Sequence, residues 1–152
     1  MTNDDARAPA PLDPETASDL LDRAREARRH SYSPYSGFPV GAALLAEDGR
    51  IFTGTNVENA SYGLTTCAER TAVVKAVSEG ARAFRAVAVV GPDDRAPCPP
   101  CGSCRQILHE VGAALLVVTP GEDGEPRVTP LRELLPGAFG GERLGRPPGG
   151  AA

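Results

Sequence analysis

Residues 97–106 read PCPPCGSCRQ and contain three of the chain's four cysteines, Cys98, Cys101 and Cys104. Each of these cysteines lies three residues from the next. The residues that follow, ILHEVG, have apolar side chains at helical spacing and end on a glycine, so the stretch predicts a helix that begins among the cysteines. The fold and the function both depend on what these thiols bind at the start of that helix.

The composition predicts one compact domain. A chain of 152 residues, 41% of them hydrophobic, has the length of a single domain and enough apolar side chains for a sizeable core. We expect this domain to occupy residues 14–139. The flanking segments, residues 1–13 and 140–152, are rich in proline, alanine, glycine and charged residues, and we expect them to be disordered tails.

Charge and hydropathy exclude several classes of partner. The formal net charge is −4, whereas nucleic-acid binding draws on a concentrated basic surface, so we expect no nucleic acid as a partner. No apolar run reaches the roughly 18–20 residues that a membrane span needs, and the N-terminus lacks the basic and apolar blocks of a secretory signal. We therefore expect a cytoplasmic protein with no membrane partner, whose clustered cysteines bind metal or react rather than form disulfides.

Local patterns predict an α/β domain. Asp13 and Pro14 begin an amphipathic helix, and Asp48-Gly49 joins the two strands of a hairpin. Farther along, helices alternate with continuous apolar runs, which is the pattern of strands covered on both faces of a sheet. The elements expected there are a helix at 66–79, strands at 84–91 and 114–120, a helix at 101–111, a short strand near Val128 and a helical turn at 129–136.

The cysteine spacing indicates a catalytic zinc site. A helix N-terminus favours the thiolate, which is the form that binds zinc, and Cys101 and Cys104 at i and i+3 can hold one ion. Cys67 lies in the first turn of the preceding predicted helix. If the two helix N-termini meet, three thiolates converge. Three protein ligands with an open fourth position are typical of catalytic zinc, whereas structural zinc has four.

An alternative interpretation uses all four cysteines. Cys98 together with Cys67, Cys101 and Cys104 would form a closed structural site or hold an iron–sulfur cluster. Two features oppose it: Cys98 lies among prolines before the helix begins, and Cys67 lacks the CxxC partner that zinc ribbons have. The residues alone leave both interpretations open.

Glu69 also allows two interpretations. In Thr66-Cys67-Ala68-Glu69 it fits a capping box, in which the Glu side chain bonds back to the N-cap amide and contributes roughly 1 kcal/mol. Two residues from a zinc ligand and followed by PCxxC, it fits the signature in which a glutamate that is not a ligand serves as general acid and base for zinc-activated water. The combination of motifs is more specific than either part.

The segments CAER, at 67–70, and PCGSCRQ, at 100–106, resemble the cytidine deaminase family in its small form with three cysteine ligands. The similarity also covers SPYSGFPVGAALL at 33–45, GRIFTGTNVENASY at 49–62 and ELLPGAFG at 133–140, in the family's order. It implies a three-layer α/β/α fold with a central mixed sheet of about five strands, and a homotetramer whose active sites are completed across subunits. It also implies hydrolytic deamination of cytidine and deoxycytidine to uridine and deoxyuridine, with release of ammonia, in pyrimidine salvage.

The resemblance assigns the metal site. Cys67, Cys101 and Cys104 would hold Zn²⁺, one ion per subunit, with water in the fourth position. Glu69 would take a proton from that water, pass it to the cytosine ring, and later protonate the departing amine. Arg70 would donate hydrogen bonds to ligand sulfurs and offset the excess negative charge of three thiolates around a dication.

The resemblance also assigns the substrate contacts. Asn56 and Glu58 would bind the sugar hydroxyls, and Phe38 would pack on the pyrimidine ring. Phe139 would reach the ring from a neighbouring subunit, while the backbone around Ala68 would read the edge of the base. Each of these residues also has an ordinary structural interpretation, as a polar side chain on a sheet edge or as part of an apolar core.

Two other functions compete with this one. A blasticidin-type aminonucleoside deaminase shares CAE and PCxxCRQ, but NVEN at 56–59 and YSGFPVGAA at 35–43 favour a cytidine substrate. Outside the enzymes, the alternative is a zinc-stapled binding module that has lost catalysis. Glu69 separates the two classes, because glutamine at this position would keep the fold and lose the proton transfer.

Overall fold

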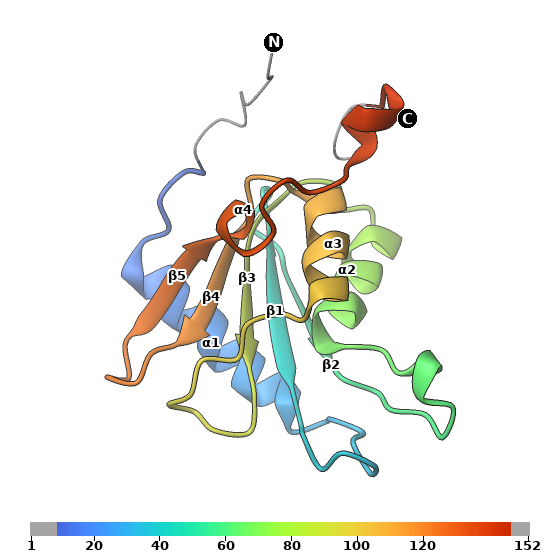
Figure 1. Cartoon of the computed structure of the whole chain (residues 1–152). Helices are drawn as coiled ribbons and strands as arrows, with labels where there is room; N and C mark the ends of the chain where they lie inside the picture. Colours follow the sequence, from blue (N-terminus) through green and yellow to red (C-terminus); the bar gives the residue numbers. More distant parts are fainter. Residues whose placement is uncertain (1–8, 147–152) are drawn as a thin grey trace.

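The computed structural model describes residues 9–146 and has a five-stranded sheet at its centre (Figure 1). The strand order is β2-β1-β3-β4-β5. β3 and β4 run parallel and the other neighbours run antiparallel, so the sheet is mixed. The strands are β1 (Gly41–Ala46), β2 (Ile51–Thr55), β3 (Phe84–Val90), β4 (Leu116–Pro120) and β5 (Pro126–Pro130).

Helices cover both faces of this sheet. In the view of Figure 1, α1 lies behind the sheet, and α2 and α3 lie in front of it. The helices are α1 (Pro14–Arg28), α2 (Ala68–Ser78), α3 (Gly102–Val111) and α4 (Leu131–Leu134), with short 3-10 helices η1 (Tyr62–Leu64) and η2 (Gly141–Leu144). The three layers confirm the α/β/α fold that the sequence predicts.

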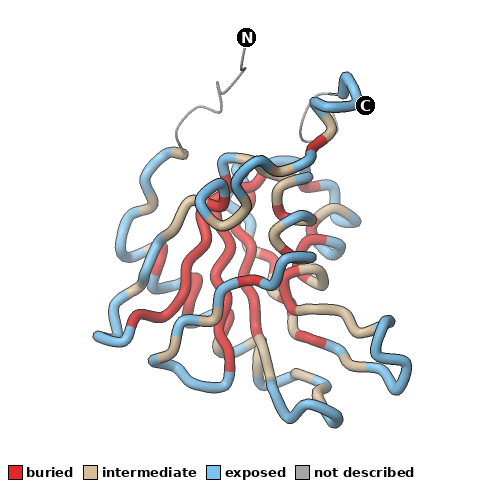
Figure 2. The backbone as a smooth tube through the Cα atoms, viewed as in Figure 1, coloured by how far each residue is buried: buried red, intermediate tan, exposed pale blue. Residues whose placement is uncertain are grey.

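Each side of the sheet has its own apolar core. On one side, leucines and alanines of α1 pack against alternate residues of β1, β3 and β4. On the other side, α2, α3 and α4 pack against the intervening residues of the same strands. β1 is buried along its whole length and β3 at every residue except Arg85, as Figure 2 shows. Burial on both faces explains why these strands read as nearly continuous apolar runs in the sequence.

Most of the predicted helix ends and turns are confirmed. The Asp13 carboxylate caps α1 and accepts a hydrogen bond of 2.8 Å from the Thr16 backbone N–H. β1 and β2 form the expected hairpin, whose turn contains Gly49 with a φ of 88°. Gly80, with a φ of 89°, follows the C-cap residue of α2. A positive φ favours glycine at both places, so these turns were readable from residue type alone.

The predicted capping box at the start of α2 is wrong. The N-cap residue is Cys67 rather than Thr66, and no side chain caps this end of the helix. Thr66 instead exchanges two backbone hydrogen bonds of 2.9 Å with Val57, which follows β2. Because this bridge fixes Thr66 outside the helix, α2 begins one residue later than the motif suggests. Glu69 therefore has no capping role.

The two predicted tails fall partly outside the described residues, since residues 1–8 and 147–152 lie beyond them. Residues 9–12 contain no helix or strand. Within the predicted C-terminal tail, Gly141–Leu144 form η2. The domain boundaries at residues 14 and 139 stay a prediction. Between residues 9 and 146, no helix is both long and apolar enough to cross a membrane.

The contact between α1 and β1 depends on Gly41. A Cβ atom at this position would lie 1.9 Å from the Ala24 carbonyl oxygen and 2.6 Å from the Arg28 backbone nitrogen. Both atoms belong to the backbone of α1, which cannot move aside as the end of a flexible side chain can. The position of α1 on the sheet therefore requires glycine in β1.

We expect Gly41→Ala to push α1 away from the sheet and to lower the free energy of unfolding by about 1–3 kcal/mol, the usual cost of overpacking. Gly63→Ala is the matched control, because an added Cβ at Gly63 meets nothing within 4 Å. Thermal unfolding of both variants beside the unaltered chain checks this. Equal midpoints for the two variants would show that α1 tolerates a side chain at Gly41.

Candidate functional site

Three cysteine thiols meet where two helices begin. Cys67 is the N-cap residue of α2, Cys101 is the N-cap residue of α3, and Cys104 lies in the first turn of α3. Their sulfur atoms all lie within 4.8 Å of one another. Figure 1 shows α2 and α3 side by side on the same face of the sheet. The unpaired N–H groups and dipoles of both helix ends therefore favour negative charge on the sulfurs.

The thiols share that charge unequally. A hydrogen bond with Cys104 lowers the pKa of Cys67 to about 5; burial opposes this shift, and the Arg70 guanidinium adds to it. The same hydrogen bond, together with burial, raises the pKa of Cys104. Like charges this close cannot all ionise unless a cation lies among them. The cluster is thus suited to hold a positive ion.

The donor set fits Zn²⁺. Thiolate sulfur binds zinc at about 2.3 Å, which in a tetrahedral site needs sulfurs about 3.8 Å apart, and the observed limit of 4.8 Å includes that spacing. Arg70 lies beside the set: its Nη2 donates to the Thr65 carbonyl at 2.5 Å and lies 3.9 Å from the Cys67 sulfur. Its Nε is buried and finds no hydrogen-bond partner in the part of the chain that the structure describes. Arg70 therefore adds positive charge next to the ligands.

Glu69 lies beside this cluster in the first turn of α2. It is 4% exposed and is the one charged residue that is buried among residues 9–146. Burial raises the pKa of its carboxyl, and the negative charge at Cys67 raises it further, while hydrogen bonds from its own backbone N–H and from Cys104, and the charge of Arg70, oppose the shift. A carboxyl whose pKa moves toward neutrality can both accept and donate protons. This setting suits an acid–base group.

Cys98 lies outside the group of sulfur atoms that the described residues bring together. Its side chain packs on Gly91, where an added Cβ would come within 3.0 Å of its sulfur. Burial and, to a smaller degree, the charge of Glu69 raise the pKa of its thiol. The geometry thus favours the three-ligand site over the four-thiolate alternative.

Asn56 is a buried residue that joins the end of β2 to the loop at residues 31–40. Its Nδ2 donates to the Phe38 carbonyl at 2.9 Å. Its Oδ1 accepts from the Val40 backbone N–H at 2.9 Å and from the Ser31 hydroxyl at 2.5 Å. At 8% exposed, Asn56 is not part of a solvent-facing polar stripe on a sheet edge.

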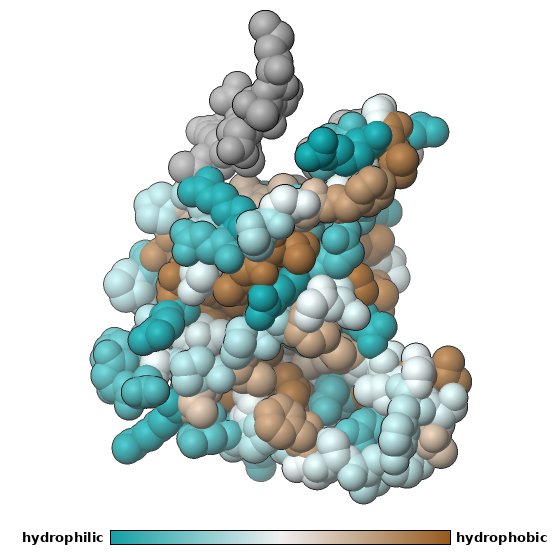
Figure 3. Space-filling model, viewed as in Figure 1, coloured by the Kyte–Doolittle hydropathy of each residue, from teal (hydrophilic) through white to brown (hydrophobic). Residues whose placement is uncertain are grey.

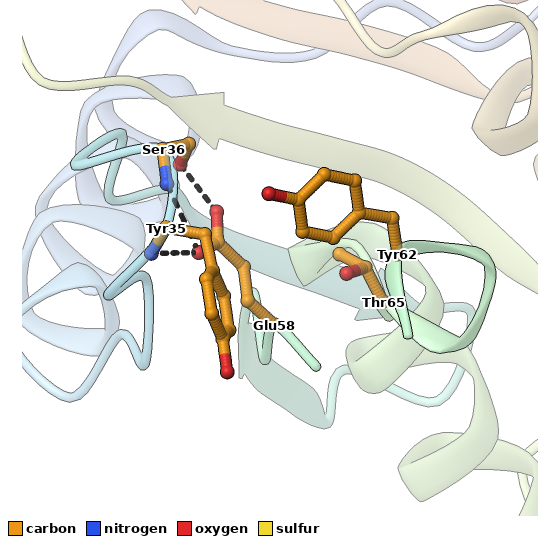
Figure 4. Close-up of a pocket in the computed structure, with 5 residues that line it drawn as sticks. All are labelled: Tyr35, Ser36, Glu58, Tyr62 and Thr65. Carbon is orange, nitrogen blue, oxygen red and sulfur yellow. Dashed lines mark hydrogen bonds between the residues drawn. The ribbon is translucent and has the colours of Figure 1, made fainter. Parts of the chain in front are cut away.

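Glu58 holds the same loop nearer to its tip. Its carboxylate accepts hydrogen bonds from the backbone N–H groups of Tyr35, at 2.8 Å, and Ser36, at 3.2 Å, and from the Ser36 hydroxyl (Figure 4). These bonds, the one from the hydroxyl first, lower the pKa of Glu58. The three residues line a cavity of about 220 Å³ together with Tyr62 and Thr65. Glu58 is therefore ionised at one wall of an open cavity.

The two phenylalanines lie in different surroundings. Phe38 is 49% exposed and lines a second cavity, of about 170 Å³, with residues of the 91–98 segment. Phe139 is 59% exposed and does not line that cavity. It lies beside α3, where the Gln106 side chain donates a hydrogen bond of 2.7 Å to its carbonyl. Ala68, the first residue of α2, is buried and lies between Cys67 and Glu69 in the chain.

Comparison with known proteins identifies the arrangement. A family model described as the cytidine and deoxycytidylate deaminase zinc-binding region matches residues 14–119. The chain belongs to this deaminase family. The match spans both helices that carry the thiols, so the family assignment and the geometry of the cysteine cluster support the same zinc site.

Individual relatives agree with the family assignment. A cytidine deaminase of Halalkalibacterium halodurans is 52% identical over 126 residues, which are 82% of this chain and 95% of the relative. One from Sporosarcina psychrophila is 50% identical over 126 residues, 82% of this chain and 92% of the relative. A crystal structure of cytidine deaminase from Burkholderia pseudomallei is 50% identical, covers 80% of this chain and 98% of its own, and has a TM-score of 0.74. The predicted family and fold are confirmed.

Several supporting residues of this deaminase site were missed in the sequence. The Ser31 hydroxyl donates to Asn56 and the Ser36 hydroxyl donates to Glu58. Their position in a loop with two prolines was the only feature of the sequence that could have indicated these contacts. Arg105, which lies in the PCGSCRQ motif, also supports the site: its Nε donates to the Pro100 carbonyl at 2.7 Å and its Nη1 to the Leu134 carbonyl at 2.7 Å. Arg105 thus braces the residue that precedes the Cys101 ligand.

We expect the purified deaminase to bind one zinc ion per chain. Cys104→Ser should lose most of this metal, because it removes one of three ligands. Cys98→Ser is the matched control and should keep it, since its sulfur lies outside the cluster. Metal content by atomic emission checks both variants. Loss of zinc from Cys98→Ser would contradict the three-ligand site and would favour the closed site with four thiolate ligands.

Proposed function

We propose that the chain catalyses the zinc-dependent hydrolytic deamination of cytidine and deoxycytidine to uridine and deoxyuridine, with release of ammonia. The observation that carries this is a buried carboxyl, Glu69, beside three thiols at two helix N-termini. The family match and the relatives named cytidine deaminase support it. The substrate is a small nucleoside, and no nucleic acid or membrane takes part.

Glu69 moves the protons in this proposal. Cys67, Cys101 and Cys104 would hold Zn²⁺, which would supply a Lewis acid for the attacking water. Glu69 accepts one proton from the attacking water and delivers it to N3 of cytosine as the water oxygen bonds to C4. It then carries the remaining proton to the exocyclic amino group, the C4–N bond breaks and ammonia leaves. A raised carboxyl pKa suits both directions of transfer.

Arg70 balances the charge of the ligands. Three thiolates carry more negative charge than Zn²⁺ carries positive, which would weaken the ion as a Lewis acid. The Arg70 guanidinium, 3.9 Å from the Cys67 sulfur, withdraws part of that charge. Its Nε has no hydrogen-bond partner among the described residues, so it can still donate a hydrogen bond to the thiolate cluster.

The polar residues after β2 recognise the sugar. Glu58 accepts three hydrogen bonds in the structure, and a carboxylate offers about four acceptor sites, so one remains for a sugar hydroxyl. Asn56 keeps one amide N–H unused after its bond to the Phe38 carbonyl. The half-exposed Phe38 ring packs on the pyrimidine, and the backbone at Ala68 reads the base edge.

The active unit is a homotetramer in this proposal. Phe139 lies away from the Phe38 cavity in its own subunit, as a residue that serves a neighbour's site would. Many large hydrophobic side chains are also exposed in the single chain, which supports their burial between subunits. Figure 3 shows hydrophobic areas among hydrophilic ones on the viewed face. These side chains include Tyr32, Tyr35, Phe38, Val57, Tyr62, Leu64, Phe139 and Leu144.

The reaction belongs to pyrimidine salvage, because it starts from a free nucleoside and returns a uracil nucleoside. A cytoplasmic location agrees with the metal site, since thiol ligands persist in a reducing compartment. The blasticidin-type reaction is not favoured, because the relatives described above are named cytidine deaminases. A binding module without activity would have no need of a buried acid–base carboxyl at the metal.

The first test is the ultraviolet absorbance change as zinc-loaded protein converts cytidine. We expect conversion by the unaltered chain and a rate lower by several orders of magnitude for Glu69→Gln, which keeps the shape of the side chain but cannot shuttle protons. Zinc content and the unfolding midpoint should not change. Glu79→Gln, an exposed site at the other end of α2, is the control and should keep full activity. Equal rates for both variants would remove Glu69 from the mechanism.

Mixed oligomers test whether Phe139 serves a neighbouring subunit. Phe139→Ala alone should lower kcat/KM about tenfold or more, the scale of losing a buried aromatic contact. Coexpression with Glu69→Gln should restore activity, because some sites then combine an intact Glu69 from one chain with an intact Phe139 from another. If Phe139 acts within its own subunit, every mixed site lacks one of the two groups and no activity returns.

A further inference from the structure

Arg28, in the last turn of α1, ties this helix to the segment that follows β3. Its Nη1 donates hydrogen bonds to the carbonyls of Gly91, at 2.5 Å, and Pro92, at 3.4 Å, and pairs with Asp94 at 2.9 Å. Arg25, one turn earlier, contacts Asp94 at 3.5 Å. The Arg28 side chain is 18% exposed, less than any other arginine that forms an ion pair in the described residues. The arginine of this ion pair is therefore more shielded from solvent than the arginines of the other pairs, whereas Asp94 is 54% exposed.

The sheet fixes where the Arg28 guanidinium lies. Gly41 pairs with Val90 at the end of β3, and the Arg28 backbone lies directly over Gly41. A Cβ added to Gly41 would come within 2.9 Å of the Arg28 Cβ. The side chain therefore starts above the last pair of β1 and β3 and reaches the carbonyl of the next residue, Gly91.

The segment from Gly91 to Cys98 has few hydrogen bonds of its own. It contains no helix or strand. Its internal bonds join the Ala96 backbone N–H to the Asp93 carbonyl, at 3.3 Å, and the Arg95 backbone N–H to the Asp93 side chain, at 2.9 Å. A segment with so little internal bonding takes its position from external contacts. Arg28 provides three of these contacts from one side chain.

The segment from Gly91 to Cys98 lines the Phe38 cavity and leads to the cysteine cluster. An added Cβ at Gly91 would lie 3.0 Å from the Cys98 sulfur and 3.5 Å from Cζ of Phe38. Phe38 and the segment enclose the cavity of about 170 Å³. Three residues beyond Cys98, the chain reaches Cys101. Arg28 thus donates to the carbonyl of Gly91, and Gly91 lies next to both the Phe38 ring and the Cys98 side chain in the cavity wall.

We propose that Arg28 is a positioning residue for deamination, which fixes the wall of the Phe38 cavity through the Gly91 carbonyl. The inference rests on the proposed function and on the place of the cytosine ring against Phe38. It gives a role in substrate binding to a helix on the opposite face of the sheet from the thiols. Arg28 acts through the segment and does not touch the reacting atoms.

Arg28→Met removes the donors and keeps the apolar stem of the side chain. We expect KM for cytidine to rise about tenfold, the scale of one charge-assisted hydrogen bond. The value of kcat should change less than about twofold, because Glu69 and the thiols keep their places. KM for deoxycytidine should rise by the same factor, since the two nucleosides share the base. Arg28→Lys, which keeps one charged donor, should recover part of the loss.

Arg23→Met is the matched control. It removes the same charge from the same helix, but among residues 9–146 Arg23 pairs only with Asp19, at 2.9 Å, and its side chain is half exposed. Its KM and kcat should equal those of the unaltered protein. A KM for Arg28→Met equal to that of Arg23→Met would overturn the inference. So would a parallel fall of kcat, bound zinc and unfolding midpoint in Arg28→Met, because that pattern reports a general loss of structure.

The same assays separate this inference from the proposed function. If the unaltered zinc-loaded protein does not convert cytidine, the proposed function fails and the inference falls with it. If the unaltered protein and Arg23→Met convert cytidine and Arg28→Met does so with an unchanged KM, only the role of Arg28 is lost.

Discussion

Three sulfur atoms that repel one another as thiolates lie within 4.8 Å, and much of the fold serves this requirement. They come from the starts of two helices on one face of the sheet, so two sets of unpaired N–H groups favour their charge. The parallel pairing of β3 and β4 requires a crossover, and α3 is that crossover. Arg70 adds a neighbouring positive charge, and a zinc ion held by the three thiols would complete the balance. Glu69, which we propose as the acid–base group, is buried in the first turn of α2 beside this cluster.

Features with a local cause were readable from the sequence. The Asp13 cap, the Gly49 turn and the buried run of β3 each follow from residue type and spacing, and the structure has all three. The capping box at Thr66 is also a local pattern, yet it failed. A backbone bridge from Val57, nine residues away in the chain, holds Thr66 and outweighs the local preference. Motifs at element ends are thus reliable only where no distant strand competes for the same backbone groups.

The site residues, too, were only partly predictable from the sequence. Regular spacing could not choose among Cys98, Cys101 and Cys104, because each is three residues from the next. The prolines around Cys98 and the PCGSCRQ resemblance favoured Cys101 and Cys104, and the structure supports that choice, since Cys98 packs on Gly91 while the other two join Cys67. The partners of Asn56 and the contacts of Arg28 join segments far apart in the chain, and no spacing rule connects them. The resemblance to a known family predicted which side chains carry the chemistry, whereas the contacts that hold those side chains in place could be seen only in the structure.

Asn56 and Glu58 also limit how the enzyme can change over evolution. The side chains that we assign to the sugar are the ones that anchor the loop at residues 31–40. A substitution that alters sugar preference at either position would also release that loop, and with Asn56 it would leave buried polar groups without partners. Selection for a new nucleoside would therefore meet a folding penalty at these two positions. Adaptation should instead accumulate at residues such as Thr65, which lines the cavity beside Glu58 and makes no hydrogen bond to that loop among residues 9–146.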